Sequence, residues 1–109
     1  MQKIVRDTAH LAFIRSMPCI NCNSYESQAA HIRKGTNGGT GIKPGDDFTV
    51  PLCHACHAQQ HQVGEPAFFG DMDAVRQLAR NLWLLSGDIM AALQTVQHWR
   101  ERRAVCSSS

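Results

Sequence analysis

The sequence has few aromatic residues and no long apolar run, and both absences limit what the chain can be. Phe, Trp and Tyr together make up 6% of the 109 residues. So few large side chains predict a thin core, which small domains often reinforce with a bound metal ion. No segment approaches the roughly 20 apolar residues that a membrane-spanning helix needs, so we expect no membrane partner.

The sequence also lacks an export signal and a strong net charge. Its N-terminal segment has no apolar core followed by a small-residue cleavage site. We therefore expect a cytoplasmic protein, in which cysteines bind metal more often than they form disulfides. The formal charge is +2, and four thiolates around one Zn²⁺ would bring it to about zero. Any affinity for nucleic acid must then come from a local patch.

Two cysteine pairs of the same spacing are present. Cys19 and Cys22 form one C-x-x-C pair, and Cys53 and Cys56 form another about thirty residues later. Each pair can present two thiolates from a tight turn, and together they complete the tetrahedral all-sulfur set of a structural zinc site. Four buried reduced cysteines or a redox-active pair are the alternatives, but the matched spacing favours zinc. Cys106 lies on a polar tail and is expected to be an inert free thiol.

The second pair also matches a haem signature. Residues 53–57, Cys-His-Ala-Cys-His, satisfy the C-x-x-C-H pattern of c-type haem attachment. Haem attachment requires export, which the N-terminus does not support, and it would leave the first cysteine pair without a role. We therefore favour zinc.

The rest of the pattern predicts short strands and amphipathic helices. Pro18 should end the first helix, Pro51 should place its strand at an edge, and Asp71 should cap a C-terminal helix. Val75, Leu78, Ala79, Leu82 and Leu85 should form one apolar helix face, and Ile89, Ala92, Leu93, Val96 and Trp99 another. The predicted elements are a helix over 7–16, a turn over 19–29, a loop over 35–47, a short strand over 48–53, a helix from about Cys56 to Gly64, and helices over 71–87 and 89–103.

A knuckle, a hairpin and a helix whose first turn carries ligands make a treble-clef arrangement. We therefore expect an α+β fold in which a short β-hairpin and a helix surround zinc, flanked by an N-terminal helix and two C-terminal helices. Residues 1–105 should form one domain, with a core over 18–64 and a helical part over 65–105. Residues 106–109 should be a disordered tail.

Three histidines suggest a second metal. His57 and His61 are four residues apart, so they share a helix face and both imidazoles can bind one ion. His31 lies where the first hairpin strand should run, which would bring it towards the same place. Two spaced histidines on a polar helix are often only solvated side chains, and His31 strengthens the functional interpretation. The others are expected to be ordinary surface or helix-packing residues: His10, His54 and His98.

Together these features resemble the HNH (His-Asn-His, ββα-metal) endonucleases, and more closely a phage- and prophage-associated branch. The matching runs between residues 18 and 88 are PCINC, AAHIR, GGTGIKPGDDFTVPLCHACHAQQH, GEPAFF and LARNLWLLSGD. The resemblance implies a ββα-metal core, with a cysteine-ligated structural zinc beneath a nuclease site built from two strands and a helix. It implies a single nuclease domain that hydrolyses DNA phosphodiester bonds in the host cell cytoplasm.

The resemblance also implies a role for each site residue. His31 matches the general base that activates water for attack on phosphorus. His57 and His61 match the helix residues that bind the catalytic divalent ion, which is Mg²⁺, Mn²⁺, Ni²⁺ or Zn²⁺. Asp46 matches the middle position, where the family name expects Asn, and Asp47 is the near alternative.

One departure concerns the residue before the base histidine. Many relatives carry an Asp or His metal ligand there, whereas this chain has Ala30. A water, Asp46 or Asp47 would then complete the metal shell. Alternatively His31 itself binds the ion, which would conflict with its role as base.

The local basic patch that DNA binding requires lies beside this site. Arg33, Lys34 and Lys43 surround it, in a glycine-rich segment whose backbone can approach phosphates closely. A solvated basic loop is the alternative. The partners implied are DNA and a host or phage recombination or packaging protein.

The C-terminal half adds two minor expectations. Phe68 and Phe69 are expected to pack in the core, with Glu65 as a cap or ion-pair partner. The basic run over 99–103 suits a helix C-terminus as well as it suits DNA contact.

The rival interpretation comes from a different class of protein. It is a non-catalytic treble-clef zinc module that binds DNA or a protein partner. Such a module would keep the cysteines, while the three histidines would lie on an ordinary surface.

Overall fold

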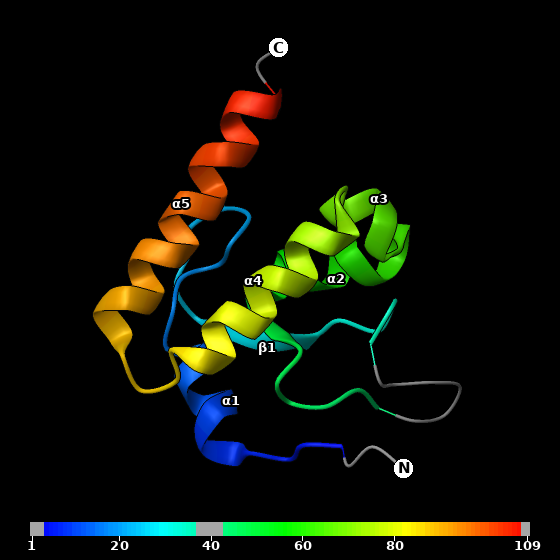
Figure 1. Cartoon of the computed structure of the whole chain (residues 1–109). Helices are drawn as coiled ribbons and strands as arrows, with labels where there is room; N and C mark the ends of the chain where they lie inside the picture. The colour runs from blue at the N-terminus through cyan, green and yellow to red at the C-terminus, as the bar shows by residue number, and fades with distance from the viewer. Residues whose placement is uncertain (1–3, 37–42, 108–109) are drawn as a thin grey trace.

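A small antiparallel sheet surrounded by helices forms the α+β fold of the chain (Figure 1). The computed structural model describes residues 4–36 and 43–107, the last four of them by their backbone alone. The elements in chain order are α1 (Thr8–Arg15), β1 (Ser27–His31), β2 (Thr49–Cys53), α2 (His54–Val63), α3 (Glu65–Phe69), α4 (Met72–Leu84) and α5 (Ile89–Ser107).

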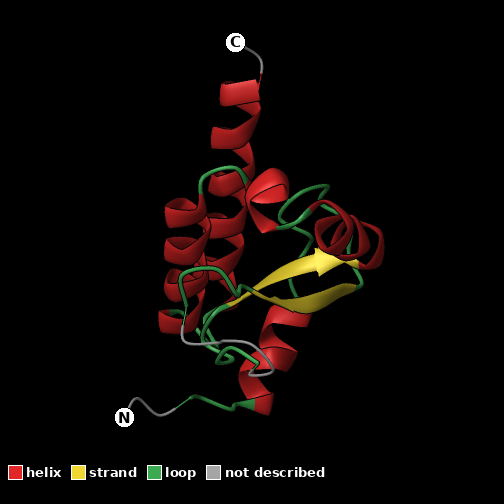
Figure 2. Cartoon of the chain, turned by 90° about the vertical axis from the view of Figure 1, so that its right-hand side faces the viewer, coloured by secondary structure: helices red, strands yellow, loops and turns green. Residues whose placement is uncertain are grey.

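The two strands pair in the middle of the molecule, with helices on both sides (Figure 2). The antiparallel register sets Ser27 opposite Cys53 and His31 opposite Thr49. Every residue of β2 is buried, because α1, α2 and α4 all pack against this strand. Pro51 lies within β2 as predicted, in a two-stranded sheet where each strand has an outer edge. The sheet therefore holds the end of β1 and the start of α2 in fixed positions.

Side-chain caps begin α1 and α4 at the places that the sequence predicted. The short helix α3 was not predicted, and it follows Gly64 without a side-chain cap. Asp7 accepts from the backbone N–H of His10 at 3.0 Å, and Asp71 caps α4 in the same way. α2 begins at His54, two residues before the predicted start at Cys56. The reason is that Cys53 is itself the N-cap: its Sγ accepts from the Cys56 N–H at 3.5 Å. β2 therefore continues into α2 without a loop.

The C-terminal helices bury most of the predicted faces. α4 ends at Leu84, short of the predicted end at residue 87, so Leu85 is its C-cap and is only half-buried. Val75, Leu78, Ala79 and Leu82 of α4 are buried, as are Ala92 and Val96 of α5. Ile89 is 39% exposed because it begins α5 at the turn from α4.

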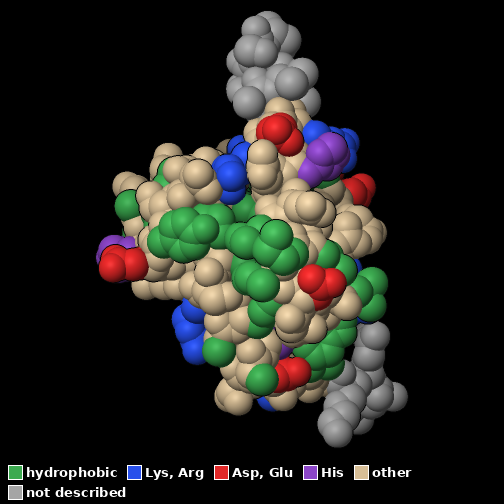
Figure 3. Space-filling model, turned by 90° about the vertical axis from the view of Figure 1, so that its left-hand side faces the viewer, with side chains coloured by type: hydrophobic (Ala, Val, Ile, Leu, Met, Phe, Trp, Pro, Cys, Tyr) green, Lys and Arg blue, Asp and Glu red, His purple; other side chains and the backbone are tan. Residues whose placement is uncertain are grey.

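The last helix also extends further than expected. α5 runs to Ser107, two residues into the segment expected to be disordered. Its C-terminal turns reach beyond the other helices (Figure 1). Apolar side chains gather in the middle of the face on the α5 side (Figure 3). Among the described residues, no helix is both long and apolar enough to cross a membrane.

Candidate metal centre and active site

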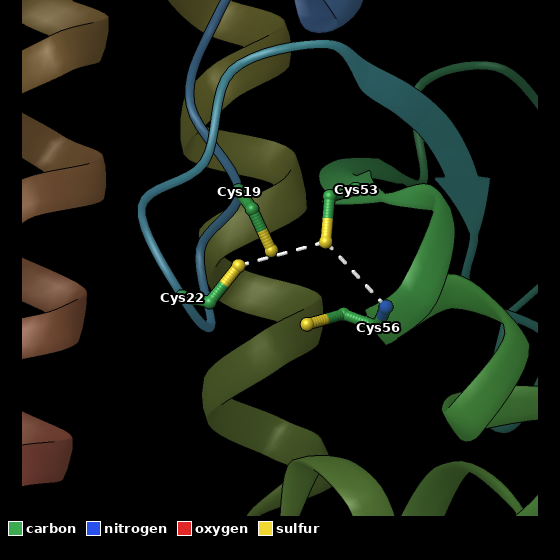
Figure 4. A group of neighbouring side chains, drawn as sticks. All are labelled: Cys19, Cys22, Cys53 and Cys56. Carbon is green, nitrogen blue, oxygen red and sulfur yellow. Dashed lines mark hydrogen bonds between the residues drawn. The ribbon is translucent and has the colours of Figure 1, made fainter.

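The four paired cysteines meet in one place. Their sulfur atoms all lie within 4.8 Å of one another, and the Sγ atoms of Cys22 and Cys53 are 3.5 Å apart (Figure 4). Four thiolates around Zn²⁺, with Zn–S bonds of about 2.3 Å, lie about 3.8 Å from one another. The donor set therefore fits a tetrahedral metal site such as that of zinc.

Local backbone structure forms the first half of this cluster. After α1, the chain turns tightly so that the N–H of Asn23 reaches the carbonyl of Cys19 at 3.0 Å. Asn23 has a φ of +69°, a left-handed conformation that asparagine tolerates better than most residues. The N–H of Ile20 donates to the Pro51 carbonyl at 3.0 Å, which fixes the turn to β2. A tight turn is therefore present at the start of the predicted range 19–29, whereas residues 27–29 belong to β1.

The electrostatics of the cluster also favour a cation. Hydrogen bonding with Ser24 lowers the pKa of Cys22 to about 6, whereas burial raises the pKa of Cys56 to about 12 and also raises that of Cys19. Buried thiolates without a counter-charge are unfavourable, and a divalent ion supplies that charge. Asn21 donates from its backbone N–H to Cys19 Sγ and from its side-chain amide to Cys56 Sγ, both at 3.4 Å. Such outer hydrogen bonds stabilise thiolate ligands.

His31 and Asp46 form a second candidate group at the end of β1. His31 Nε2 lies 2.9 Å from Asp46 Oδ1, and because a carboxylate only accepts, the imidazole donates this bond. The other oxygen, Oδ2, accepts from the backbone N–H of Asp7 at 2.8 Å. The Arg6 guanidinium lies 3.8 Å from Oδ1. Asp46 is 2% exposed, so both of its oxygens are buried against donors.

These contacts shift the pKa of both partners. Burial lowers the pKa of His31 below its ordinary value, against the raising effect of Asp46, and the charges of Lys43 and Arg6 lower it further. For Asp46, burial alone would raise the pKa. The hydrogen bonds from His31 and the Asp7 N–H, with the nearby positive charges, outweigh it, so the pKa is lowered. The pair is therefore a neutral imidazole against an ionised carboxylate near neutral pH.

The neighbouring carboxylate faces a different element. Asp47 Oδ2 accepts from Arg80 of α4 at 2.6 Å, and the Arg80 guanidinium also lies over the Phe48 ring. Of the two aspartates that the sequence left open, Asp46 is therefore the one in contact with His31.

His57 and His61 form a third candidate group on α2. Their Nε2 atoms are 3.2 Å apart and their ring centroids 4.8 Å apart. Helical spacing of four residues places them on one face, as predicted. On the other side of the His57 ring, Nδ1 lies 2.7 Å from Oε1 of Gln28 on β1.

The three histidines lie close enough to interact, although they do not form one compact cluster. Burial lowers the pKa of His57, and the charges of His61, His31 and His54 lower it further. α2 packs against β1, as expected from the sequence. Within the described part of the chain, however, only the four cysteines bring three or more ligand atoms within 4.8 Å of one another.

The predicted basic residues are exposed, and side chains from other segments form hydrogen bonds with their backbones. The Glu65 carboxylate accepts from the backbone N–H groups of Arg33 and Lys34, at 2.7 and 2.8 Å. Arg6 donates to the Lys43 carbonyl at 2.8 Å. Glu65 therefore caps a loop rather than pairing with a charged side chain. Residues 37–42, which are part of the predicted loop over 35–47, lie outside the described residues.

Other predicted residues take structural positions. Phe68 and Phe69 are buried in the core and pack edge to face. His10 is buried between α1 and the end of α4, where its Nδ1 lies 2.8 Å from Ser86 Oγ. The side chain of Cys106 lies outside the described part of α5.

The sequence did not indicate a role for Gln28 or Arg6. Gln28 Nε2 lies 3.4 Å from His54 Nδ1, so the same amide meets two histidines of α2. Neither Gln28 nor Arg6 belongs to a spaced motif. Gln28 lies 29 residues before His57, and Arg6 lies 40 residues before Asp46. Because of these separations, no local sequence pattern indicates either contact.

The part of the chain that carries these groups also matches a family model. The model described as "Protein of unknown function (DUF968)" covers residues 2–69, more than half of the chain. The chain belongs to the DUF968 family. The DUF968 match contains both cysteine pairs, Gln28, the His31–Asp46 pair and the two α2 histidines, and it ends before α4. No curated protein and no solved structure matches the chain.

Proposed function

We propose that the chain is a metal-dependent HNH endonuclease that hydrolyses DNA phosphodiester bonds and is encoded by a phage or prophage. The observation that carries the proposal is the pair of facing nitrogens, His57 Nε2 and His61 Nε2, 3.2 Å apart on the helix that follows the second cysteine pair. A histidine held by a carboxylate lies at the end of the strand that packs against this helix. In this proposal, the hairpin, α2 and the cysteine-bound zinc form a treble-clef core.

The spacing of the two α2 nitrogens fits one divalent ion. Two imidazoles that bind one ion at about 2.0–2.1 Å have nitrogens about 2.8–3.4 Å apart, for bond angles from a right angle to the tetrahedral value. The observed 3.2 Å falls in this range. The ion, Mg²⁺, Mn²⁺, Ni²⁺ or Zn²⁺, would stabilise the charge that develops on the phosphorus centre and the leaving 3′-oxygen.

His31 is the residue that takes a proton from water in this proposal. Its Nε2 donates to Asp46 Oδ1 at 2.9 Å, which places the lone pair of the neutral ring on Nδ1. Burial holds the pKa of His31 below its ordinary value, so the ring is neutral near pH 7 and ready to accept a proton. A direct role in binding the ion would compete with this function.

Asp46 acts as a positioning residue in this scheme. Oδ1 accepts from His31 and Oδ2 accepts from the Asp7 N–H, so neither oxygen is directed to a metal. With Ala30 before the base, the ion would have two histidine ligands from this chain, and water or substrate oxygens would fill the remaining positions.

The basic residues supply the DNA contact. Arg33, Lys34 and Lys43 are exposed, and Lys43 lies close enough to influence the pKa of His31. Phosphate contacts of this kind give affinity without sequence preference. We therefore expect binding that weakens strongly as salt concentration rises.

The test is cleavage of supercoiled plasmid by the zinc-loaded protein with each of the four divalent ions. Wild type should nick or linearise the plasmid with at least one ion. His31→Ala should abolish cleavage and keep the zinc, whereas His98→Ala, a change at an exposed histidine of α5, should cut like wild type. A Cys19→Ala variant should lose both its zinc and its folded structure. This result separates loss of the scaffold from loss of the base.

A second candidate function is a non-catalytic zinc module that binds DNA or a protein. It is favoured by the observation that, among described residues, only the cysteines form a group of three or more ligand atoms. This candidate predicts one bound metal per chain and no cleavage with any ion. That pair of results would reject the nuclease.

A further inference from the structure

Gln28 connects the sheet to the histidine-bearing face of α2. It lies in β1, half-buried, and its side-chain amide reaches across to two rings of the helix. Oε1 lies 2.7 Å from His57 Nδ1, and Nε2 lies 3.4 Å from His54 Nδ1. The amide therefore offers its acceptor to one histidine and its donor to the other.

The acceptor contact determines which nitrogen of His57 carries the proton. An amide oxygen only accepts, so His57 Nδ1 must be protonated to make a bond of 2.7 Å. In the neutral ring, Nε2 then carries the lone pair. Nε2 is the atom that faces His61 Nε2 at 3.2 Å, so the lone pair points to the place where the proposed ion binds.

The reverse arrangement of the amide would oppose this. An N–H directed at His57 Nδ1 would require the lone pair there and move the ring proton to Nε2. A protonated Nε2 cannot bind a metal. The structure instead pairs the amide N–H with His54 Nδ1. This contact places the lone pair of exposed His54 on Nδ1 and its proton on Nε2.

The fold fixes the position of this amide. Gln28 pairs with Leu52 across the sheet, and Leu52 is fully buried. One residue later, Cys53 ends β2 and caps α2. Only the cap therefore separates the strand register from the first turn of the helix, so Gln28 and His57 hold their relative position without an intervening loop.

We propose that Gln28 is a positioning residue that holds His57 in the tautomer whose Nε2 binds the divalent ion shared with His61. This inference rests on the proposed function, because it names a residue that hydrogen-bonds to a metal ligand of the same site. Outer hydrogen bonds to metal-bound histidines typically change metal affinity by about 10–100-fold. We expect a change of this size when the acceptor of Gln28 is lost.

The experiment compares binding of Co²⁺ and Ni²⁺ to zinc-loaded wild type, Gln28→Glu and Gln28→Met, by calorimetry and by Co²⁺ absorption. Glutamate keeps the acceptor and should bind the second ion as tightly as wild type or more tightly. Methionine has a similar length without an acceptor and should bind about 10–100-fold more weakly. Gln59→Met, at an exposed position of α2, is the matched control and should match wild type.

A second readout does not depend on metal binding. Long-range ¹H–¹⁵N NMR spectra of the zinc-loaded protein should show His57 protonated at Nδ1 in wild type and Gln28→Glu. In Gln28→Met this preference should be lost, with unchanged thermal unfolding and zinc content as evidence that the fold is kept. A wild-type His57 protonated at Nε2 would overturn the proposal.

The outcomes also separate this inference from the proposed function. If wild type binds a second ion and Gln28→Met binds it equally well, the role of Gln28 is wrong while the metal site stands. If Glu and Met substitutions weaken binding equally, the acceptor is not what matters, and the proposal also fails. If wild type binds no ion beyond zinc, the metal site itself is rejected.

Discussion

The most informative single substitution is Asp46→Asn, because it keeps the shape of the side chain and removes one acceptor. In the folded protein, both oxygens of Asp46 face donors: His31 Nε2–H at 2.9 Å and the Asp7 backbone N–H at 2.8 Å. An asparagine has one oxygen and one NH₂ group. Whichever way it turns, it must place a donor against a donor or force His31 into the other tautomer.

Each orientation has a distinct effect. If the NH₂ group faces the Asp7 N–H, two buried donors oppose each other, which costs about 1–3 kcal/mol of folding free energy. If it faces His31, the ring must move its proton to Nδ1, and the nitrogen assigned to accept a proton from water is no longer free. Loss of a general base typically lowers the rate by about 10²–10⁴-fold.

The second orientation leaves no two donors opposed, so we expect it to prevail. Asp46→Asn should then retain zinc and lose nearly all plasmid cleavage. The charge of Asp46 raises the pKa of His31 against the effect of burial, so any residual activity should extend to lower pH than in wild type. Asp73→Asn is the control, because the side chain of Asp73 is 92% exposed. If Asp46→Asn cut within about threefold of wild type, positioning of His31 by this carboxylate would be refuted.

Three further predictions concern other parts of the molecule. Stripping zinc with a chelator should unfold the cysteine turns and α2, as measured by far-ultraviolet circular dichroism. The reason is that binding of a structural zinc contributes about 10–16 kcal/mol, whereas the free energy of unfolding of a small domain is only about 5–15 kcal/mol. Cys106→Ala is the control and should leave the zinc content unchanged. Burial lowers the pKa of His10 below 6.5, so the unfolded state binds more protons as pH falls through 6.5, and stability should fall in that range. Urea titrations should show a smaller loss for His10→Leu between about pH 7 and about pH 5; an equal loss would exclude His10 as its source. Glu65→Ala removes the acceptor of two loop N–H groups and should weaken DNA binding by roughly fivefold, about 1 kcal/mol, in fluorescence anisotropy, with unchanged zinc content; unaltered affinity would show that this loop does not contact DNA.

Features encoded by nearby residues could be predicted from the sequence. The four cysteines were predictable because their paired spacing is itself the ligand geometry, and they do meet within 4.8 Å. The Asp7 and Asp71 caps act within their own first turns. The apolar face of α4 follows from helical periodicity alone.

Features that depend on contacts between distant segments could not be predicted. The choice between Asp46 and Asp47 is made by Asp7 and by Arg80, which lie 39 and 33 residues away from them, respectively. The start of α2 was misplaced because a cysteine acts as its N-cap, a role that residue preferences assign to serine, threonine, aspartate or asparagine. Gln28 gave no signal because a single glutamine in a strand belongs to no motif.

The direct passage from β2 into α2 makes the length of this segment as important as its composition. One residue inserted between Cys56 and His57 would leave all four sulfurs in place and turn the following helix by about 100°. His57 and His61 would keep their mutual spacing. However, His57 would no longer lie within hydrogen-bond distance of Gln28, and both histidines would move away from His31. Such a protein would fold, hold zinc and be inactive, so across related sequences this segment should tolerate exchanges of residues far better than gaps.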